Sequence, residues 1–79
     1  MNYHLLYFAS LADAAGCGEE RIDSPAATPA ALYAQVRQCH GFVFDAERLR
    51  VAVNGVLVDW DHVLADEDQI VFLPPVSGG

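Results

Sequence analysis

The chain has 79 residues, of which 53 % are hydrophobic, and a formal net charge of -7. A chain of this length forms one domain, which buries only about 60 % of the surface that its unfolded form exposes. No apolar run approaches the ~20 residues of a membrane-spanning helix, and an acidic surface argues against nucleic acid, whose phosphates attract basic groups.

The first part of the chain predicts two strands joined by a short helix. Residues 3–8 form a continuous apolar and aromatic run, which is typical of a central strand covered on both faces. Ser10 resembles the start of a capping box, so we expect a short helix from there that ends at Gly16 or Gly18. Residues 20–23 then predict a second, short strand.

The clearest element is a helix that ends at His40. Thr28 is a good N-cap, and Pro29 suits the first helical position, where its missing N–H costs nothing. Gly41 closes the helix, and we expect His40 in the last turn to interact with the free carbonyl groups there. The apolar stripe expected to face the core consists of Leu32, Val36 and Cys39.

The second half of the chain predicts a hairpin and a last strand. Residues 48–53 alternate between apolar and polar side chains, and residues 56–58 form the returning strand. Asn54-Gly55 between them is the strongest short hairpin signal, because both residues tolerate a positive φ. Residues 69–73 form an apolar strand that ends at Pro74-Pro75.

This order of elements predicts an α+β domain of the β-grasp (ubiquitin-like) type. A mixed sheet would pack on one main helix, with the first and last strands adjacent. We expect the domain to span residues 1–73 and residues 74–79 to form an extended C-terminal tail.

The tail has the composition of a chain end that enters another protein's pocket. Pro74 and Pro75 restrict the backbone conformation at the start of the tail. Gly78 and Gly79 have no side chains and can therefore pass a narrow channel. The reactive group would be the α-carboxylate of Gly79. It needs activation with ATP, most simply as an acyl adenylate, before sulfur can form a thiocarboxylate or an amine can form an amide.

A partner must supply this activation, because the chain has no phosphate-binding glycine loop. We expect no cofactor bound by this chain itself and no metal site, since its two cysteines are too few for a four-ligand zinc centre. The N-terminus lacks the pattern of a secretory signal, which favours a cytoplasmic protein.

Three runs of residues resemble the small subunit of molybdopterin synthase, the sulfur carrier of molybdenum cofactor biosynthesis. They are Leu6-Tyr7-Phe8-Ala9, then Ala52-Val53-Asn54-Gly55-Val56-Leu57-Val58 with Asp61-His62, and Phe72-Leu73-Pro74-Pro75-Val76-Ser77-Gly78-Gly79. The resemblance implies an adenylating E1-like activating enzyme and a sulfurtransferase that convert Gly79 into a thiocarboxylate. It also implies that two small subunits join a dimer of large subunits and donate sulfur to cyclic pyranopterin monophosphate.

The resemblance further implies a surface for the large subunit. Phe8, Leu57 and Leu73 fall where the family places an apolar patch, and Arg48 falls where it often has a basic residue. His62 matches the family pattern, although a turn residue is the simpler interpretation. With Gly79 as the reacting residue, the expected binding residues are Phe8, Leu57, Phe72, Leu73, Pro74, Pro75, Val76, Ser77 and Gly78.

Three alternatives stay open. The chain could carry sulfur for another product, such as the thiazole of thiamine. It could be a ubiquitin-like protein modifier that is joined through Gly79 to lysines of its targets. It could also be a binding module whose terminus has no chemistry.

Overall fold

The computed structural model describes residues 1–74 of the chain. The elements in chain order are β1 (Asn2–Tyr7), α1 (Ala9–Ala15), β2 (Glu19–Asp23), α2 (Pro29–His40), the 3-10 helix η1 (Ala46–Arg48), β3 (Arg50–Val53), β4 (Val56–Val58) and β5 (Gln69–Leu73). The predictions for Pro75, Val76, Ser77, Gly78 and Gly79 lie outside the described residues.

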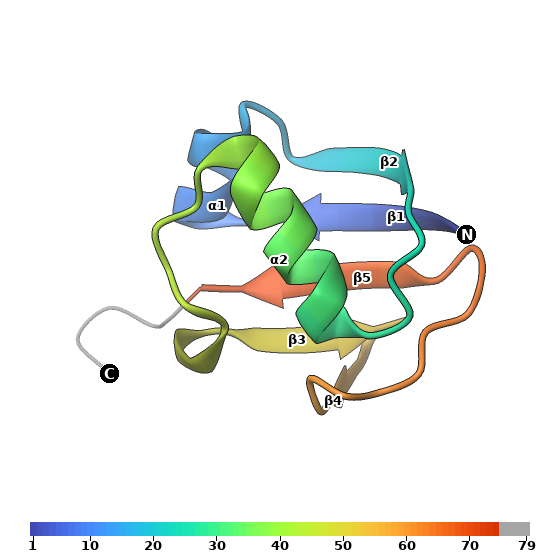
Figure 1. Ribbon diagram of the computed structural model, residues 1–79. Coiled ribbons are helices and arrows are strands. Elements are labelled where there is room, and N and C mark those ends of the chain that lie inside the picture. Colours follow the sequence, from blue (N-terminus) through green and yellow to red (C-terminus); the bar gives the residue numbers. More distant parts are fainter. Residues whose placement is uncertain (75–79) are drawn as a thin grey trace.

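The strands form one mixed sheet in the order β2-β1-β5-β3-β4. β1 and β5 run parallel, whereas the other three neighbouring pairs are antiparallel. Figure 1 shows α2 crossing one face of this sheet, with the N-terminus at one end and the end of β5 at the other. This is the predicted β-grasp fold, and the expected adjacency of the first and last strands is confirmed.

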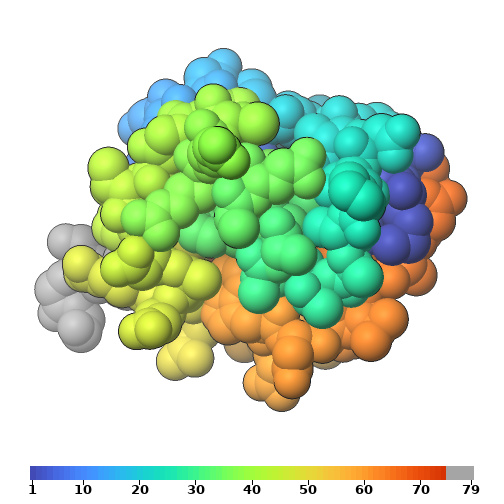
Figure 2. Space-filling model, viewed as in Figure 1, coloured from blue at the N-terminus to red at the C-terminus, as the bar shows by residue number. Residues whose placement is uncertain are grey.

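The core lies between the sheet and α2. The ring of Tyr33 on α2 lies 5.1 Å from that of Phe72 on β5, and Trp60 stacks on Phe72 at 5.9 Å. Figure 2 shows α2, in green, lying across this face of the molecule. The sheet residues buried beneath it are Tyr3, Leu5, Tyr7, Val51, Val53, Ile70 and Phe72.

Helix α2 has the predicted bounds and caps. The hydroxyl of Thr28 accepts a hydrogen bond from the N–H of Ala31 at 3.2 Å, and Gly41 ends the helix with a φ of 71°. The expectation that Cys39 faces the core is wrong, because its side chain is exposed. Tyr33 is buried instead, one residue along from Leu32, and this turns the apolar stripe away from Cys39.

Helix α1 begins differently from the prediction. It starts at Ala9, with Phe8 as the N-cap, and no side chain caps it. The proposed role of Ser10 as a cap is therefore wrong. The direct turn from β1 into α1 places Ser10 inside the helix rather than before it, and Gly16, with a φ of 77°, provides the expected end.

These two helix starts give a matched stability test. Thr28→Ala removes the only side-chain cap found at a described α-helix, so the free energy of unfolding should fall by about 1 kcal/mol. Ser10→Ala removes an exposed hydroxyl without a capping bond, so the change should stay within about 0.5 kcal/mol. Urea unfolding measures both values. Equal losses would contradict the two assignments.

The hairpin forms at the predicted turn. Asn54 and Gly55 have φ values of 51° and 84°, as a two-residue hairpin turn requires. The predicted strand 48–53 starts later, at Arg50, because η1 turns the chain immediately before it and Leu49 donates its N–H to the Ala46 carbonyl. The side chain of Asn54 also accepts from the N–H of Gln69, which joins the turn to β5.

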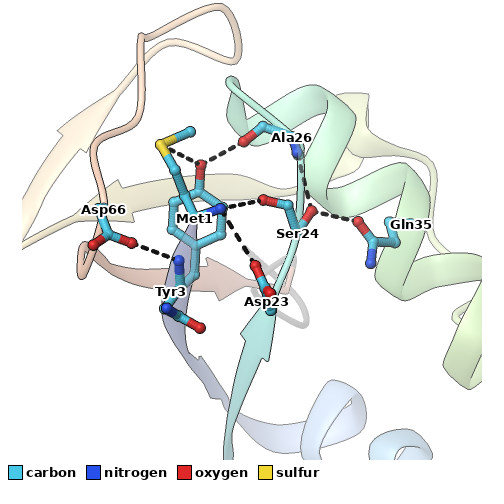
Figure 3. Close-up of polar contacts among 8 residues, drawn as sticks. Met1, Tyr3, Asp23, Ser24, Ala26, Gln35 and Asp66 are labelled. Carbon is cyan, nitrogen blue, oxygen red and sulfur yellow. Dashed lines mark hydrogen bonds and ion pairs between the residues drawn. The ribbon is translucent and has the colours of Figure 1, made fainter.

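Figure 3 shows how the start of β1 holds the connector between β2 and α2. The ammonium group of Met1 donates to the carbonyl oxygen of Ser24 at 2.9 Å, and the hydroxyl of Tyr3 donates to that of Ala26. Ser24, only 1 % exposed, donates to Gln35 Oε1 at 2.5 Å and accepts from the N–H of Ala26. Within residues 1–74, no buried side-chain nitrogen or oxygen lacks a partner.

All three tyrosines of the chain are buried, so alkaline pH should destabilise the fold. Burial raises the pKa of Tyr3, Tyr7 and Tyr33 above the ordinary value of about 10. Above that pH the unfolded chain loses tyrosine protons that the folded chain keeps, so the free energy of unfolding falls as pH rises. Below it this contribution is fully present.

The check is a pair of alkaline titrations, one followed by tyrosinate absorbance and one by far-ultraviolet circular dichroism. The two transitions should coincide above pH ~10, because the tyrosines ionise only as the fold opens. Tyrosinate absorbance that rises near the ordinary pKa while the helix signal stays unchanged would contradict the burial.

Candidate functional site

The root of the tail leaves from the middle of the sheet. β5 lies between β1 and β3 and ends at Leu73, which pairs with Arg50 of β3. On its other side, Phe72 pairs with Tyr7, so Phe8 leaves the β1–β5 pair at the same end as Leu73. The two residues before Pro74, Phe72 and Leu73, are thereby fixed by pairing with β1 and β3.

The sheet face opposite α2, here called the open face, has an apolar stripe across four strands. Inward residues alternate with outward residues along each strand, so the neighbours of the buried Leu5, Tyr7, Ile70 and Phe72 point to the open face. Cross-strand pairs then align Leu6 with Val71, Val71 with Ala52, and Ala52 with Leu57. The apolar stripe consists of Phe8, Leu6, Val71, Leu73, Ala52 and Leu57.

Three of the predicted binding residues contribute to this stripe. Phe8 and Leu57 are 51 % and 65 % exposed, and Leu73 is half-buried beside the tail root. Large apolar side chains with this exposure mark a contact surface when they are contiguous. The stripe can therefore hold a partner against the sheet while the tail root lies next to it.

Phe72 has a different place from the other predicted residues. Its side chain has no exposed area and packs between Tyr33 and Trp60. Its expected contact with a partner is therefore corrected: the ring anchors the end of β5 in the core. Pro74, the last described residue, is half-buried.

Sequence reasoning missed the half-buried Leu6 and Val71 and the buried Ala52 as residues of the apolar stripe. They come from three strands, and only the register of β1 with β5 and of β5 with β3 brings them together. The alternation of buried positions along each strand was a usable signal, but the strand order was needed to align them.

A polar cluster lies on the sheet face that α2 covers, at Tyr7, whose strand neighbour is Phe72 of β5. Glu20 on β2 accepts from the Tyr7 hydroxyl at 2.7 Å and lies 2.6 Å from Nε2 of His40. Burial, followed by the hydrogen bond to Glu20, raises the pKa of Tyr7. The side chain of His40, in the last turn of α2 as predicted, thus ties α2 to β2.

Arg48 and His62, the two other residues that the resemblance singled out, make contacts within the domain. The guanidinium of Arg48 lies 5.8 Å from the centre of the Phe44 ring, a cation–π contact. His62 is an exposed turn residue whose N–H donates to the Asp59 carbonyl at 3.1 Å. The part of the chain that the structure describes has no group of three or more His, Cys, Asp or Glu residues placed to hold a metal ion.

Within the same residues, neither helix is both long and apolar enough to cross a bilayer. The described site consists of an apolar surface and a strand end, and its chemistry is that of binding. The reacting group that the sequence predicts, the carboxylate of Gly79, lies beyond the described residues.

Comparisons with known proteins agree with this geometry. The model of the ThiS family matches residues 5–79. The molybdopterin synthase sulfur carrier subunit of Escherichia coli (strain K12) is 53 % identical over 32 residues, which are 40 % of this chain and 40 % of that protein. The match thus spans less than half the length of this curated relative.

Solved structures match over nearly the whole length. The putative molybdopterin converting factor subunit 1 of Pyrococcus furiosus has a TM-score of 0.81 at 30 % identity, covering 96 % of this chain and 99 % of that one. SAMP1 of Haloferax volcanii has a TM-score of 0.78 at 26 % identity, with 100 % of both chains covered. A chain in the complex of subunits 1 and 2 of molybdopterin-converting factor from Helicobacter pylori 26695 gives 0.69 at 26 %, again over 100 % of both.

The family match runs from the middle of β1 through every later element to the last residue, and it includes both the apolar stripe and the Gly-Gly ending. The chain belongs to the ThiS family.

Proposed function

We propose that this chain is the sulfur carrier subunit of molybdopterin synthase. The observation that carries the proposal is the join between the Pro-Pro-Val-Ser-Gly-Gly ending and the central strand β5, beside an apolar stripe in which Phe8 and Leu57 are exposed. The names of the Escherichia coli relative and the Pyrococcus furiosus structure support it. Residues 1–73 act as the β-grasp domain and residues 74–79 as the extended tail.

The chemistry takes place at the carboxylate of Gly79. An E1-like activating enzyme joins this carboxylate to the AMP portion of ATP and releases pyrophosphate. Sulfur that a sulfurtransferase system delivers at the oxidation level of sulfide then attacks the acyl carbon and displaces AMP, which gives the Gly79 thiocarboxylate. Gly78 and Gly79, which lack side chains, let the activated end enter a narrow pocket.

The partner is the large subunit of molybdopterin synthase. The apolar stripe docks on it, and the tail, through Pro75, Val76, Ser77 and Gly78, delivers sulfur to cyclic pyranopterin monophosphate. The Helicobacter pylori structure, a complex of subunits 1 and 2 of molybdopterin-converting factor, supports this arrangement. Two carriers on a dimer of large subunits supply the two sulfurs of the dithiolene.

Mass spectrometry of the intact chain from its native host tests the chemistry. We expect a fraction whose mass differs from that of the free acid by the exchange of one oxygen for sulfur. We also expect the large subunit to co-purify. A plain carboxylate in every preparation, without a large subunit, would overturn the proposal.

A second candidate function is covalent modification of proteins. The similarity to SAMP1 of Haloferax volcanii, a small archaeal modifier protein, favours it. In that case Gly79 is joined to lysine amines of target proteins. Because the last basic residue of the chain is Arg50, tryptic digests of the native host would then contain target peptides with residues 51–79 joined through Gly79 to lysine, and their absence would favour the carrier.

A further inference from the structure

Arginine side chains are scarce in this acidic chain, and most have partners within it. Three of the four arginines interact with another side chain of residues 1–74. The pairs are Arg21 with Glu67 at 2.6 Å, Arg37 with Asp45 at 2.9 Å, and Arg48 with the ring of Phe44 at 5.8 Å. For the side chain of Arg50, the structure of the same residues records no ion pair, hydrogen bond or ring contact.

Arg50 stands on the open face, next to the tail root. It is exposed, whereas its neighbour Val51 is buried against α2, so the two side chains point to opposite faces. Its cross-strand partner is Leu73, the last residue before the tail. Arg50 therefore borders the apolar stripe at the point where the chain leaves the sheet.

A hollow of about 320 Å³ lies beside Arg50. Besides Arg50, the residues that line it are Val51, Leu57, Val58, Asp59 and Trp60, and Arg50 forms no ion pair with Asp59 in the described part of the chain. Its volume is at the lower end of the range for small-ligand pockets, and Arg50 is the positively charged residue of its lining. It fits a side chain with an apolar stem and a negatively charged end.

We propose that Arg50 is the charged anchor of the apolar stripe and binds an aspartate or glutamate side chain of the large synthase subunit, which enters this hollow. The proposal rests on the function proposed above and names the chemistry of the partner. Apolar contacts are non-directional, whereas the planar guanidinium forms paired hydrogen bonds of fixed geometry with a carboxylate. The anchor thus selects one alignment of the stripe on its partner.

Local charge complementarity supports this occupant, because the guanidinium of Arg50 attracts a carboxylate although the chain as a whole is acidic. With a net charge of -7, the carrier attracts a partner that is basic overall, so a carboxylate opposite Arg50 is a local reversal of that pattern. A partner or competitor without this carboxylate would leave a guanidinium buried and unpaired in the interface, which is costly. Arg50 therefore contributes specificity as well as affinity.

The test compares Arg50→Gln with Arg21→Gln by titration against the large synthase subunit of the same organism. Both changes remove one positive charge from the open face, so any change in long-range attraction is the same for the two variants. We expect Arg50→Gln to raise Kd at least about tenfold, as loss of a charge-assisted hydrogen bond does. Arg21→Gln should change Kd less than about threefold, because its pair with Glu67 is exposed.

Steady-state kinetics of sulfur transfer distinguish weaker docking from a loss of folded or active carrier. With thiocarboxylated carriers as the sulfur donor, Arg50→Gln should raise KM by the same factor as Kd and leave kcat within about twofold. Arg50→Lys, which keeps the charge but not the fork, should recover part of the affinity. Urea unfolding of each variant should match the parent, because Arg50 is exposed and unpaired within residues 1–74.

The outcomes distinguish this inference from the function on which it rests. If the parent chain binds the large subunit and Arg50→Gln binds equally well, the anchor is wrong and the carrier function stands. If the parent chain neither binds the large subunit nor donates sulfur, the function fails and the anchor fails with it. Restored binding of Arg50→Glu by a carboxylate-to-lysine change in the large subunit would identify the paired residue.

Discussion

Deleting Gly79 is expected to abolish sulfur transfer to the pterin while the domain stays folded. The deletion moves the terminal carboxyl back by one residue, about 3.5 Å along an extended chain. A reacting group displaced by even ~1 Å can lose about a hundredfold in rate, so activity should fall below detection in a reconstituted assay. The assay measures pterin sulfuration with the activating enzyme, sulfurtransferase and large subunit present.

Two further variants make this deletion specific. Adding one glycine after Gly79 displaces the carboxyl in the opposite direction and should also abolish transfer. Ser10→Ala, an exposed change in α1, should keep full activity. Thermal unfolding of all three should match the parent, because none of the changes alters a side chain of the core that the described residues form. Pterin sulfuration by the shortened chain at the parent rate would sink the proposed role of Gly79.

The elements that could be predicted from the sequence are those set by local chemistry. Thr28, Pro29 and Gly41 define α2 because a cap, a fixed φ and a left-handed residue act within one turn of the helix. Asn54 and Gly55 define the hairpin for the same reason. None of these signals depends on a distant part of the chain.

Predictions that depended on tertiary contacts were less accurate. Ser10 has the sequence of a cap, but the turn out of β1 makes Phe8 the N-cap, two residues earlier. Cys39 has helical spacing from Leu32 and Val36, but burial of Tyr33 turns the stripe. In both cases the local sequence allowed two arrangements, and packing against a neighbouring element selected one of them.

The candidate site divides in the same way. The tail was found from its composition, and its chemistry stays a prediction because residues 75–79 are outside the described part of the chain. Leu6, Val71 and Ala52 could not be grouped from the sequence, since they lie on three strands whose order is non-sequential. Arg50 was read only as one of the polar positions of an alternating strand, and its place beside Leu73 emerged from the register.

The apolar stripe gives the second large expected effect: Leu57→Glu should weaken binding to the large synthase subunit at least about a hundredfold. Leu57 is 65 % exposed in the free chain, so the change removes little of the folded core. In the complex, it replaces about 1.5–3 kcal/mol of apolar burial with a carboxylate that must lose its water. Titration of the variant against the large subunit measures the loss.

Val63→Glu is the matched control. Val63 is 76 % exposed, and the change adds the same charge, but the next residue, Leu64, hydrogen-bonds to Ala27 just before α2 on the covered side of the sheet. Its Kd should stay within about threefold of the parent value, since a surface charge outside the contact acts only through screened attraction. Equal weakening by both variants would mean that added negative charge, and not loss of the apolar contact, weakens binding. Equal retention would remove the open face from the interface and leave the tail as the whole of the recognition.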